Sequence, residues 1–346
     1  MRTPEERKYA ARRRRRRNAH ANVATVGVFA LAALGVLQFY RPPETLARAP
    51  FALAAPGAPS ASPALDAFGA SGAVRIRFAM PASRIEYPLE VGGDPSALRY
   101  EWVSLADSCV VDSAVALEGA DVVVPNKPGF YRLALVRDTA REVMQEPTVA
   151  VMVPFETKKG GWLNGYRIGM YLSERFAGIH ERPTGFLEVH EDELDLAVSK
   201  HFKLSDFLTH DTQGDVWPKY VALDPRLLDK LELVLAKLRE THGNAERVDL
   251  SPDVHSGFRT PAHNAGVLRA ASDSRHQYGD AADVVIDADG DGRITMRDEA
   301  LVAQAVDQVE TAHPELVGGM GLYTSSRYHT PYVHIDTRGH RSRWRG

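Results

Sequence analysis

The last third of the chain holds two histidines and one aspartate whose types and spacing could bind a catalytic metal ion. His276 lies in a glycine-flanked turn, Asp283 lies in the apolar run "AADVVI" that follows, and His334 lies in a later run, "YVHID". Two histidines and one carboxylate leave a fourth tetrahedral position for water, as catalytic zinc requires. The spacing alone leaves a second interpretation open, in which the histidines are ordinary surface or core residues and Asp283 belongs to a turn.

A second acidic stretch, "DADGDGRITMRD", occupies residues 287–298. It fits the twelve-residue calcium loop, with aspartates at positions one, three and five and a glycine at position six. Position twelve is an aspartate where glutamate is usual, and the shorter side chain predicts weak affinity. The alternative is an acidic turn without metal. The expected calcium ligands are the side chains of Asp287, Asp289, Asp291 and Asp298 and the backbone carbonyl of Arg293.

The composition restricts which atoms could hold a metal. Cys109 is the only cysteine, which excludes an intramolecular disulfide and an all-cysteine metal cage. The ligands must therefore come from His, Asp, Glu or backbone oxygen. With 346 residues, 44% hydrophobic and 25% charged, the chain is long enough for two globular domains.

The N-terminal region has the pattern of a membrane anchor. Residues 1–20 contain nine Lys or Arg, and residues 21–40 contain no charged side chain. A helix of that length spans about 30 Å, the hydrocarbon thickness of a bilayer, and the arginines favour a cytoplasmic N-terminus. We expect a basic cytoplasmic tail, a transmembrane signal anchor at 21–40, and a single-pass inner-membrane protein with a periplasmic or otherwise extracytoplasmic catalytic domain. A cleaved signal peptide or a buried helix are the alternatives, and we expect no nucleic-acid partner.

Three further regions follow the anchor. Residues 41–72 are rich in proline and alanine, which predicts an extended linker. Residues 73–155 alternate short apolar runs with turns, which predicts a small all-β immunoglobulin-like sandwich, although Trp102 and Cys109 lack the antibody-type spacing. Residues 160–346 combine two amphipathic helical patterns with late strands, which predicts an α+β domain with the calcium loop as an insertion.

Three motifs of the C-terminal region resemble one enzyme family. They are "SGFRTPAHN" (256–264), "SRHQYGDAAD" (274–283) and "GGMGLY…YVHIDTRGHRSRW" (318–344). In this order they resemble the zinc D-Ala-D-Ala carboxypeptidase family, whose metallopeptidase fold is shared with lysostaphin-type endopeptidases and the hedgehog signalling domain. The resemblance covers roughly residues 160–344. It implies that His276, Asp283 and His334 hold zinc, and that Arg259 and Ser274 contact substrate.

The resemblance is incomplete at the general base. Several relatives have an acidic residue three positions before the last zinc histidine, but this chain has Pro331 there. Asp336 shares a strand face with His334, so it is the first candidate either for the base or for a residue that orients His334. Pairing with Arg338 or Arg341 is the alternative for Asp336, and a surface salt bridge is the alternative for Arg259. His329 matches a histidine that some relatives use near the reacting carbonyl.

The sequence thus predicts a membrane-anchored zinc peptidase with a structural calcium ion. It would hydrolyse peptide bonds next to D-amino acids in peptidoglycan stem peptides, as a carboxypeptidase or an endopeptidase. Two alternatives from other classes are a non-catalytic peptidoglycan-binding protein and a hedgehog-type interaction protein that keeps a zinc site.

Overall fold

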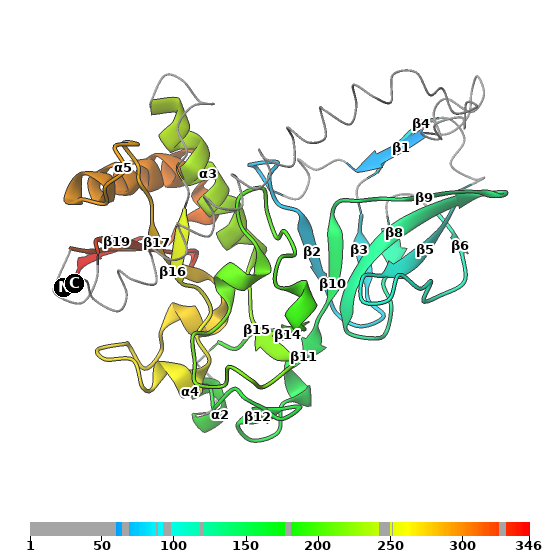
Figure 1. Cartoon of the computed structure of the whole chain (residues 1–346), viewed down its shortest axis with the longest axis horizontal. Helices are drawn as coiled ribbons and strands as arrows, with labels where there is room; N and C mark the ends of the chain where they lie inside the picture. The colour runs from blue at the N-terminus through cyan, green and yellow to red at the C-terminus, as the bar shows by residue number, and fades with distance from the viewer. Residues whose placement is uncertain are drawn as a thin grey trace, which may run out of the picture.

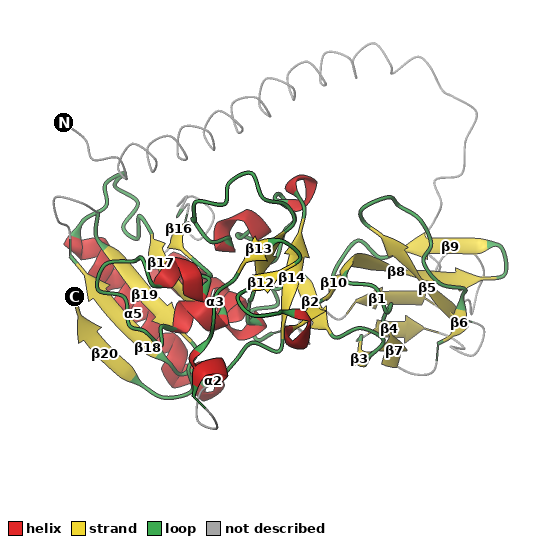
Figure 2. Cartoon of the chain, turned by 90° about the horizontal axis from the view of Figure 1, so that it is seen from below, coloured by secondary structure: helices red, strands yellow, loops and turns green. Residues whose placement is uncertain are grey.

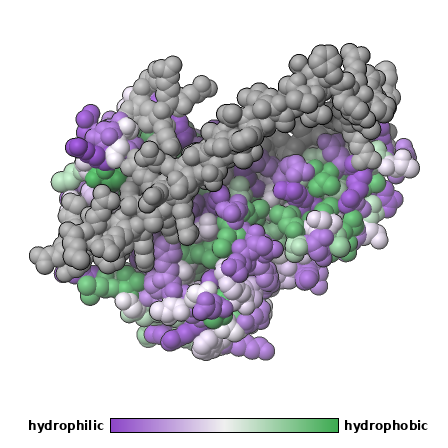
Figure 3. Space-filling model, viewed as in Figure 1, coloured by the Kyte–Doolittle hydropathy of each residue, from purple (hydrophilic) through white to green (hydrophobic). Residues whose placement is uncertain are grey.

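The computed structural model has a β-rich first part and a second part that contains the two long helices (Figure 1). Hydrophilic and hydrophobic residues intermix over the described surface in Figure 3, as on most globular proteins. The predicted tail 1–20, the segment 21–40 and most of the predicted linker lie outside the described residues. The described residues are 60–63, 69–87, 89–92, 98–117, 121–176, 181–241, 250, 252–324 and 330–346.

The structure corrects the expected fold class and localisation where both depend on a transmembrane helix. No helix within the described ranges is long and apolar enough to cross a membrane. The two longest helices of that part have 17 residues each, which is about 25 Å at 1.5 Å per residue, short of a bilayer core of about 30 Å. An N-terminal transmembrane helix and a single-pass inner-membrane protein are therefore not supported, and the segment 21–40 on which they depended is not among the described residues.

The β-rich part is built on a six-stranded sheet. Its buried core contains Tyr87, Trp102, Val122 and Leu133. The indole N–H of Trp102 donates to the carbonyl of Val123 at 2.7 Å, which joins the large sheet to a two-stranded one. The strands in order are β2 (Ile76–Ala79), β10 (Thr148–Val151), β8 (Gly129–Arg137), β5 (Arg99–Ser104) and β6 (Val115–Ala116), with β9 (Ala140–Val143) on β8; β3 (Arg84–Glu86) pairs with β7 (Asp121–Val123), and β1 (Ser60–Pro63) with β4 (Leu89–Gly92).

A small antiparallel sheet follows the β-rich part and shares its core with the second part. Its strands are β11 (Val153–Pro154), β14 (Gly185–Val189) and β15 (Lys219–Val221). The hairpin of β12 (Trp162–Leu163) and β13 (Tyr166–Arg167), the helices α2 (Leu172–Arg175) and α4 (Pro261–Asn264), and the 3-10 helices η4 (Phe155–Thr157), η5 (Glu191–Glu193) and η6 (Leu204–Phe207) complete this region.

The second part has a five-stranded sheet with two long helices packed on one face (Figure 2). Its register puts Val333 and Ile335 on the helix side, in the apolar core, and therefore turns His334 to the opposite face. The strands in order are β16 (Asp253–Ser256), β17 (Ala281–Val285), β19 (Tyr332–Asp336), β18 (Gly319–Tyr323) and β20 (Ser342–Arg345), and the helices are α3 (Pro225–Thr241), α5 (Met296–Ala312), η7 (Arg275–Tyr278) and η8 (Pro314–Leu316).

The helix α3 forms because its sequence combines a start signal with an apolar stripe. The carboxylate of Asp224 accepts from the backbone N–H of Arg226 at 2.8 Å, and Pro225 occupies the first helical position. The buried side chains of α3 include Leu227, Leu231 and Leu238, which recur at helical spacing. Full burial of each such leucine contributes about 1.5 to 3 kcal/mol. The helix therefore covers part of the core behind the sheet with its apolar side chains.

Candidate metal centre

The structure brings His276, Asp283 and His334 together on the open face of the five-stranded sheet. Asp283 of β17 lies directly opposite His334 of β19, and His276 comes from η7, which leads into β17. One ligand atom from each residue lies within 4.8 Å of the others, and all three residues are buried. The side chains predicted from the sequence as one ligand set thus form one cluster.

The three atoms have the separations of a tetrahedral metal face. His276 Nε2 and His334 Nδ1 are 3.1 Å apart, and Asp283 Oδ1 lies 3.2 Å from the first and 2.9 Å from the second. Ligand atoms about 2.0 to 2.1 Å from a tetrahedral zinc are separated by about 3.3 Å. Lone-pair atoms this close repel one another unless a proton or a cation lies between them. The donor set therefore fits zinc.

The other nitrogen of each histidine ring has a fixed partner. His276 Nδ1 lies 2.7 Å from the carbonyl of Gly257, and His334 Nε2 lies 3.1 Å from Asp336 Oδ2. A carbonyl oxygen can only accept, so His276 donates from Nδ1 and keeps its Nε2 lone pair for the cluster. Hydrogen bonds of this kind set the tautomer and ring orientation of metal-ligating histidines. Both rings are held in the orientation that a metal site requires.

Burial and neighbouring charges shift the pKa values within the cluster in different directions. Burial lowers the pKa of His276 below its ordinary value. Burial would also lower the pKa of His334, but hydrogen bonds to Asp283 and Asp336 outweigh it and raise that pKa. Burial would raise the pKa of Asp283, but the two histidines hold that pKa well below its ordinary value. Asp283 is thus ionised, and its carboxylate can serve as a metal ligand.

Arg259 lies at the cluster and contacts Asp283. Its guanidinium donates to Asp283 Oδ2 at 2.5 Å and to Ser256 Oγ at 2.7 Å. Only Asp283 Oδ1 faces the histidines, so Arg259 fixes the carboxylate with one oxygen directed at the cluster. The side chain of Arg259 is 14% exposed, which rules out the surface salt bridge considered from the sequence. Ser274, the other expected substrate contact, is the residue before η7.

Asp336 is fully buried and its carboxylate is already used. Besides His334, it accepts from the backbone N–H of Gly319 at 2.6 Å and from the guanidinium of Arg338 at 2.9 Å. Burial alone would raise the pKa of Asp336, but these hydrogen bonds hold it far below its ordinary value. The geometry therefore favours the orienting role over the base role. Arg341, the other partner considered for Asp336, pairs with Asp307 instead at 2.9 Å.

Glycines of β18 make room for the buried groups beside His334. A Cβ on Gly319 would collide with the carboxylate of Asp336, and one on Gly321 would collide with the ring of Trp344. Gly321 is paired directly with His334 in the sheet. The "GGMG" run is thus explained by side chains that pack across it.

Aromatic side chains that sequence reasoning missed border the cluster. Tyr332 lies two residues before His334 on the same strand, and its ring stacks on Tyr323 with centroids 4.6 Å apart. His255 of β16 stacks on the other side of Tyr332 at 5.8 Å. The ring of Trp344 is 5.1 Å from that of His334. Two-residue alternation from His334 is the signal that could have found Tyr332. The predicted His329 lies outside the described residues.

The acidic loop begins two residues after β17. Carboxylate oxygens of Asp287, Asp289 and Asp291 lie within 4.8 Å of one another. Asp298 does not join them, because its two oxygens accept from backbone N–H groups of Ala288 at 2.8 Å and Thr295 at 2.8 Å. The hydrogen bond from Thr295 caps the start of α5, and the one from Ala288 links this helix to the start of the loop. Asp298 thus has a capping role in this structure, and its expected role as the calcium ligand at position twelve stays a prediction.

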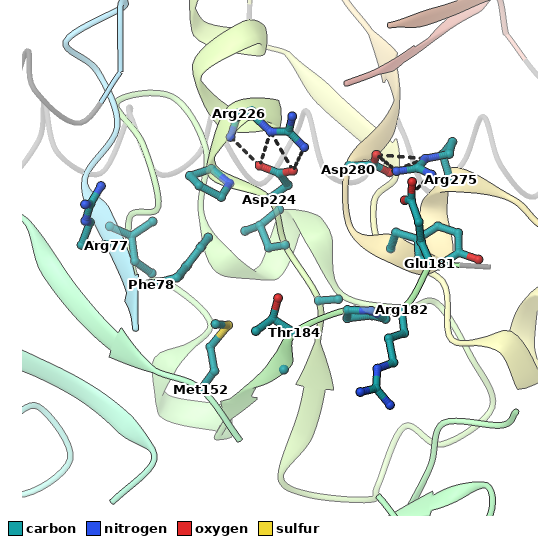
Figure 4. Close-up of a pocket in the computed structure, with 17 residues that line it drawn as sticks. Arg77, Phe78, Met152, Glu181, Arg182, Thr184, Asp224, Arg226, Arg275 and Asp280 are labelled. Carbon is teal, nitrogen blue, oxygen red and sulfur yellow. Dashed lines mark hydrogen bonds and ion pairs between the residues drawn. The ribbon is translucent and has the colours of Figure 1, made fainter. Parts of the chain in front are cut away.

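A cavity of about 350 Å³ lies between the β-rich part and the second part (Figure 4). Its lining includes Phe78 of β2, Met152 and Tyr278 of η7. Three of the arginines at its wall are paired with carboxylates, which offsets their charge. The pairs are Arg226 with Asp224 at 2.7 Å, Arg275 with Glu181 at 2.8 Å and with Asp280, and Arg182 with Glu156 at 2.9 Å.

Comparison with known proteins gives weak structural similarities. Neither a family model nor a curated protein matches the chain. A solved L-Ala D-Glu endopeptidase of Serratia marcescens is 21% identical, with a TM-score of 0.24, over 34% of this chain and 83% of that chain. Immunoglobulin domains 1–5 of Sidekick-1 are 14% identical, with a TM-score of 0.16, over 23% of this chain and 16% of that chain. Similarity at these values assigns no family.

Proposed function

We propose that the chain is a zinc-dependent peptidase that hydrolyses peptide bonds next to D-amino acids in peptidoglycan. The observation that carries the proposal is the triangle of three donor atoms at 2.9 to 3.2 Å, each on a side chain whose other polar atom has a fixed partner. The three motifs that resemble zinc D-Ala-D-Ala carboxypeptidases supply the substrate class. The masses of the released fragments distinguish a carboxypeptidase from an endopeptidase.

The metal would be held by His276 Nε2, His334 Nδ1 and Asp283 Oδ1. When bound at such a site, zinc polarises the scissile carbonyl and makes water nucleophilic near neutral pH. The chain's own contribution is preorganisation, because the hydrogen bonds to Gly257 and Asp336 hold both imidazole rings before any metal arrives.

Arg259 would bind the oxygen of the substrate that carries negative charge. A guanidinium has five N–H donors, and the hydrogen bonds to Asp283 and Ser256 use two of them. The remaining donors suit a terminal carboxylate or the oxygen of the reacting carbonyl. An uncharged replacement, Arg259→Gln, should therefore slow hydrolysis more than it weakens metal binding.

The proton acceptor of the proposed reaction must be a residue other than Asp336 and Pro331. Asp336 is committed to three partners, and Pro331 carries no titratable group. Two histidines remain as candidates: His329, from the resemblance, and His255, because its ring stacks on Tyr332 beside the cluster. Separate His255→Ala and His329→Ala variants distinguish them, since loss of the true acceptor lowers kcat and leaves zinc content unchanged.

A second function, a non-catalytic peptidoglycan-binding protein that keeps the zinc site, is favoured by one observation. The carboxylate of Asp336 beside the cluster is used for orientation and cannot also exchange protons freely. Such a protein would retain zinc and sediment with peptidoglycan but release no fragments.

The calcium loop stays a prediction from the sequence pattern, with the side chains of Asp287, Asp289, Asp291 and Asp298 and the Arg293 carbonyl as ligands.

The deciding experiment is mass spectrometry of purified peptidoglycan after incubation with the full chain. Zinc-loaded protein should release D-alanine or stem-peptide fragments, and both chelator treatment and His276→Ala should abolish the release. The fragment masses identify the bond that is cut. Retention of zinc and peptidoglycan without new fragments would favour the binding protein. Absence of zinc from the wild-type protein, with no activity after zinc is added, would refute the peptidase proposal.

A further inference from the structure

A buried ion pair lies behind the sheet, on the side opposite the candidate metal centre. Lys230 of α3 is fully buried, and its Nζ donates to Glu310 Oε1 of α5 at 2.7 Å. The side chain of Glu310 is 3% exposed. This pair joins the two long helices, and both of its residues lie among the buried apolar side chains of those helices.

The same pair also contacts the main chain at the start of β18 and at the end of β19, the strand that carries His334. Lys230 Nζ donates to the backbone carbonyl of Asp336 at 2.7 Å. Glu310 Oε1 accepts from the backbone N–H of Gly318 at 3.1 Å, and Arg343 donates to the Gly318 carbonyl at 2.8 Å as well as to Glu310. The ends of β18 and β19 are therefore fixed from the helix side. Asp336, at the end of β19, holds His334 from the other side.

Stability alone is a poor explanation for this pair. Burial lowers the pKa of Lys230, which records the cost of keeping a charge away from water, although Glu310 offsets part of it. Replacing a buried ion pair with apolar residues of similar volume is often neutral or stabilising. Methionine at both positions keeps unbranched side chains between α3 and α5 and removes the charges. The charged side chains of Lys230 and Glu310 are better explained by their hydrogen bonds to the main chain, which apolar side chains could not make.

We propose that Lys230 and Glu310 are positioning residues for the metal centre, which fix the backbone of Asp336 so that its carboxylate holds His334 in the metal-binding orientation. The contacts run from Glu310 to Lys230, to the Asp336 carbonyl, and through the Asp336 carboxylate to His334. This inference rests on the proposed function, because it assumes that the orientation of His334 serves a metal.

The experiment compares two buried, hydrogen-bonded charged side chains of α3: Lys230, changed together with Glu310, and Glu232. The double variant Lys230→Met/Glu310→Met removes both charges together, so no unpaired charge stays in the core. The control is Glu232→Gln, because Glu232 is also a buried residue of α3 but bonds to Ser199 and His201, at 2.6 and 2.8 Å, away from the sheet. Zinc affinity is measured by competition with a chromogenic chelator, and melting temperature is measured for the metal-free full chain.

Loss of a residue that orients a metal ligand weakens binding by about 10- to 100-fold. We expect a loss of about tenfold in zinc affinity for the double variant and less than twofold for Glu232→Gln, whatever the melting temperatures of the two. Equal zinc affinity of the double variant and the wild type overturns the inference. If the double variant does not fold, Glu310→Asp keeps the charge but withdraws it by one methylene, and should weaken zinc binding about threefold; unchanged affinity of Glu310→Asp overturns the inference equally.

A second readout needs no metal. In the metal-free protein labelled with ¹⁵N-histidine, the Nε2–H proton of His334 should exchange slowly because Asp336 accepts it, and the double variant should speed that exchange. A wild type that binds no zinc would refute the proposed function, and the exchange rate would still decide the positioning role. Unchanged exchange in the double variant would refute that role.

Discussion

The histidine–aspartate cluster and the acidic loop flank the same strand, β17, but they are built by different contacts. In the cluster, the ligand side chains are held by residues from other segments: Gly257 for His276, and Arg259 for Asp283. In the loop, the three clustered carboxylates accept from backbone N–H groups two to five residues away, as Asp287 does from Gly292 at 2.9 Å and Asp291 from Arg293 at 2.7 Å.

This difference separates a pattern from a preorganised site. Asp and Gly residues in a tight turn form short-range hydrogen bonds of this kind with or without a cation. The three ligand side chains of the cluster come from η7, β17 and β19, and each is held through the polar atom that faces away from the cluster. This arrangement requires the folded sheet and does not stabilise a local turn. The cluster is therefore the stronger candidate for metal binding, and variants can test that ranking.

The largest expected effect is on zinc retention, and it is tested by removing one candidate ligand from the cluster and one from the loop. His276→Ala should abolish zinc retention, because two donors remain of the three that zinc requires from the protein. Asp289→Ala should keep one zinc per chain, since its carboxylate lies in the loop. Metal analysis of both full-length variants after gentle purification measures this. Equal zinc loss in both would break the distinction between the regions.

The next effect tests whether the far-side contacts matter. Asp336→Asn should weaken zinc binding by about 10- to 100-fold, because an amide is a poorer acceptor for the His334 N–H. The matched control is Asp307→Asn, which also removes a carboxylate bound to arginine, from Arg341 and Arg343, but touches no cluster residue. Competition with a zinc chelator gives both affinities. If the two variants bind zinc equally well, orientation by Asp336 contributes nothing.

In these regions the sequence could predict which residues lie together but not all of the contacts that their side chains make. The clustering of His276, Asp283 and His334 could be predicted, because apolar alternation gives the sheet face of Asp283 and the resemblance of the motifs groups the three residues as one ligand set. The role of Asp336 could not, since alternation gives its face but not the direction of its two oxygens. Asp298 matches a calcium ligand by position, but position alone could not show that its carboxylate also caps α5 through Thr295. Lys230 gave no signal within a leucine-rich helical stripe.

A smaller effect concerns the loop itself. If residues 287–298 bind calcium, a concentration of about ten times the Kd should stabilise the folded protein by about 1.4 kcal/mol. For a 346-residue protein that unfolds as one unit, with an unfolding entropy of about 2.1 cal/mol/K per residue, that is a rise of about 2 °C in melting temperature, and Asp289→Ala should remove it. Calorimetry with and without calcium, on zinc-loaded protein, measures the difference. An unchanged melting temperature would leave an acidic turn.

The smallest effect comes from a buried carboxylate in the first turn of α5, next to the loop. Burial raises the pKa of Glu299, although Arg345 opposes this. A carboxyl group with a raised folded-state pKa costs stability when ionised, and the cost disappears as pH falls through that pKa to below the ordinary value of about 4.3. Glu299→Gln should therefore raise the melting temperature by about 1 to 2 °C at pH 7 and not at pH 4. The same gain at both pH values would exclude an ionised Glu299 as the cause.

The packing of Trp344 gives the protein an intrinsic optical probe. Its indole ring lies 5.1 Å from the ring of His334, and its N–H donates to the hydroxyl of Tyr323 at 2.9 Å. The chain has four tryptophans, of which Trp102 is buried in the β-rich part and Trp162 is exposed. Any cation or proton that arrives at His334 alters the electric field at the Trp344 indole. Its fluorescence should therefore follow occupancy of the site in real time without an added dye, and the spectrum of Trp344→Phe supplies the background to subtract.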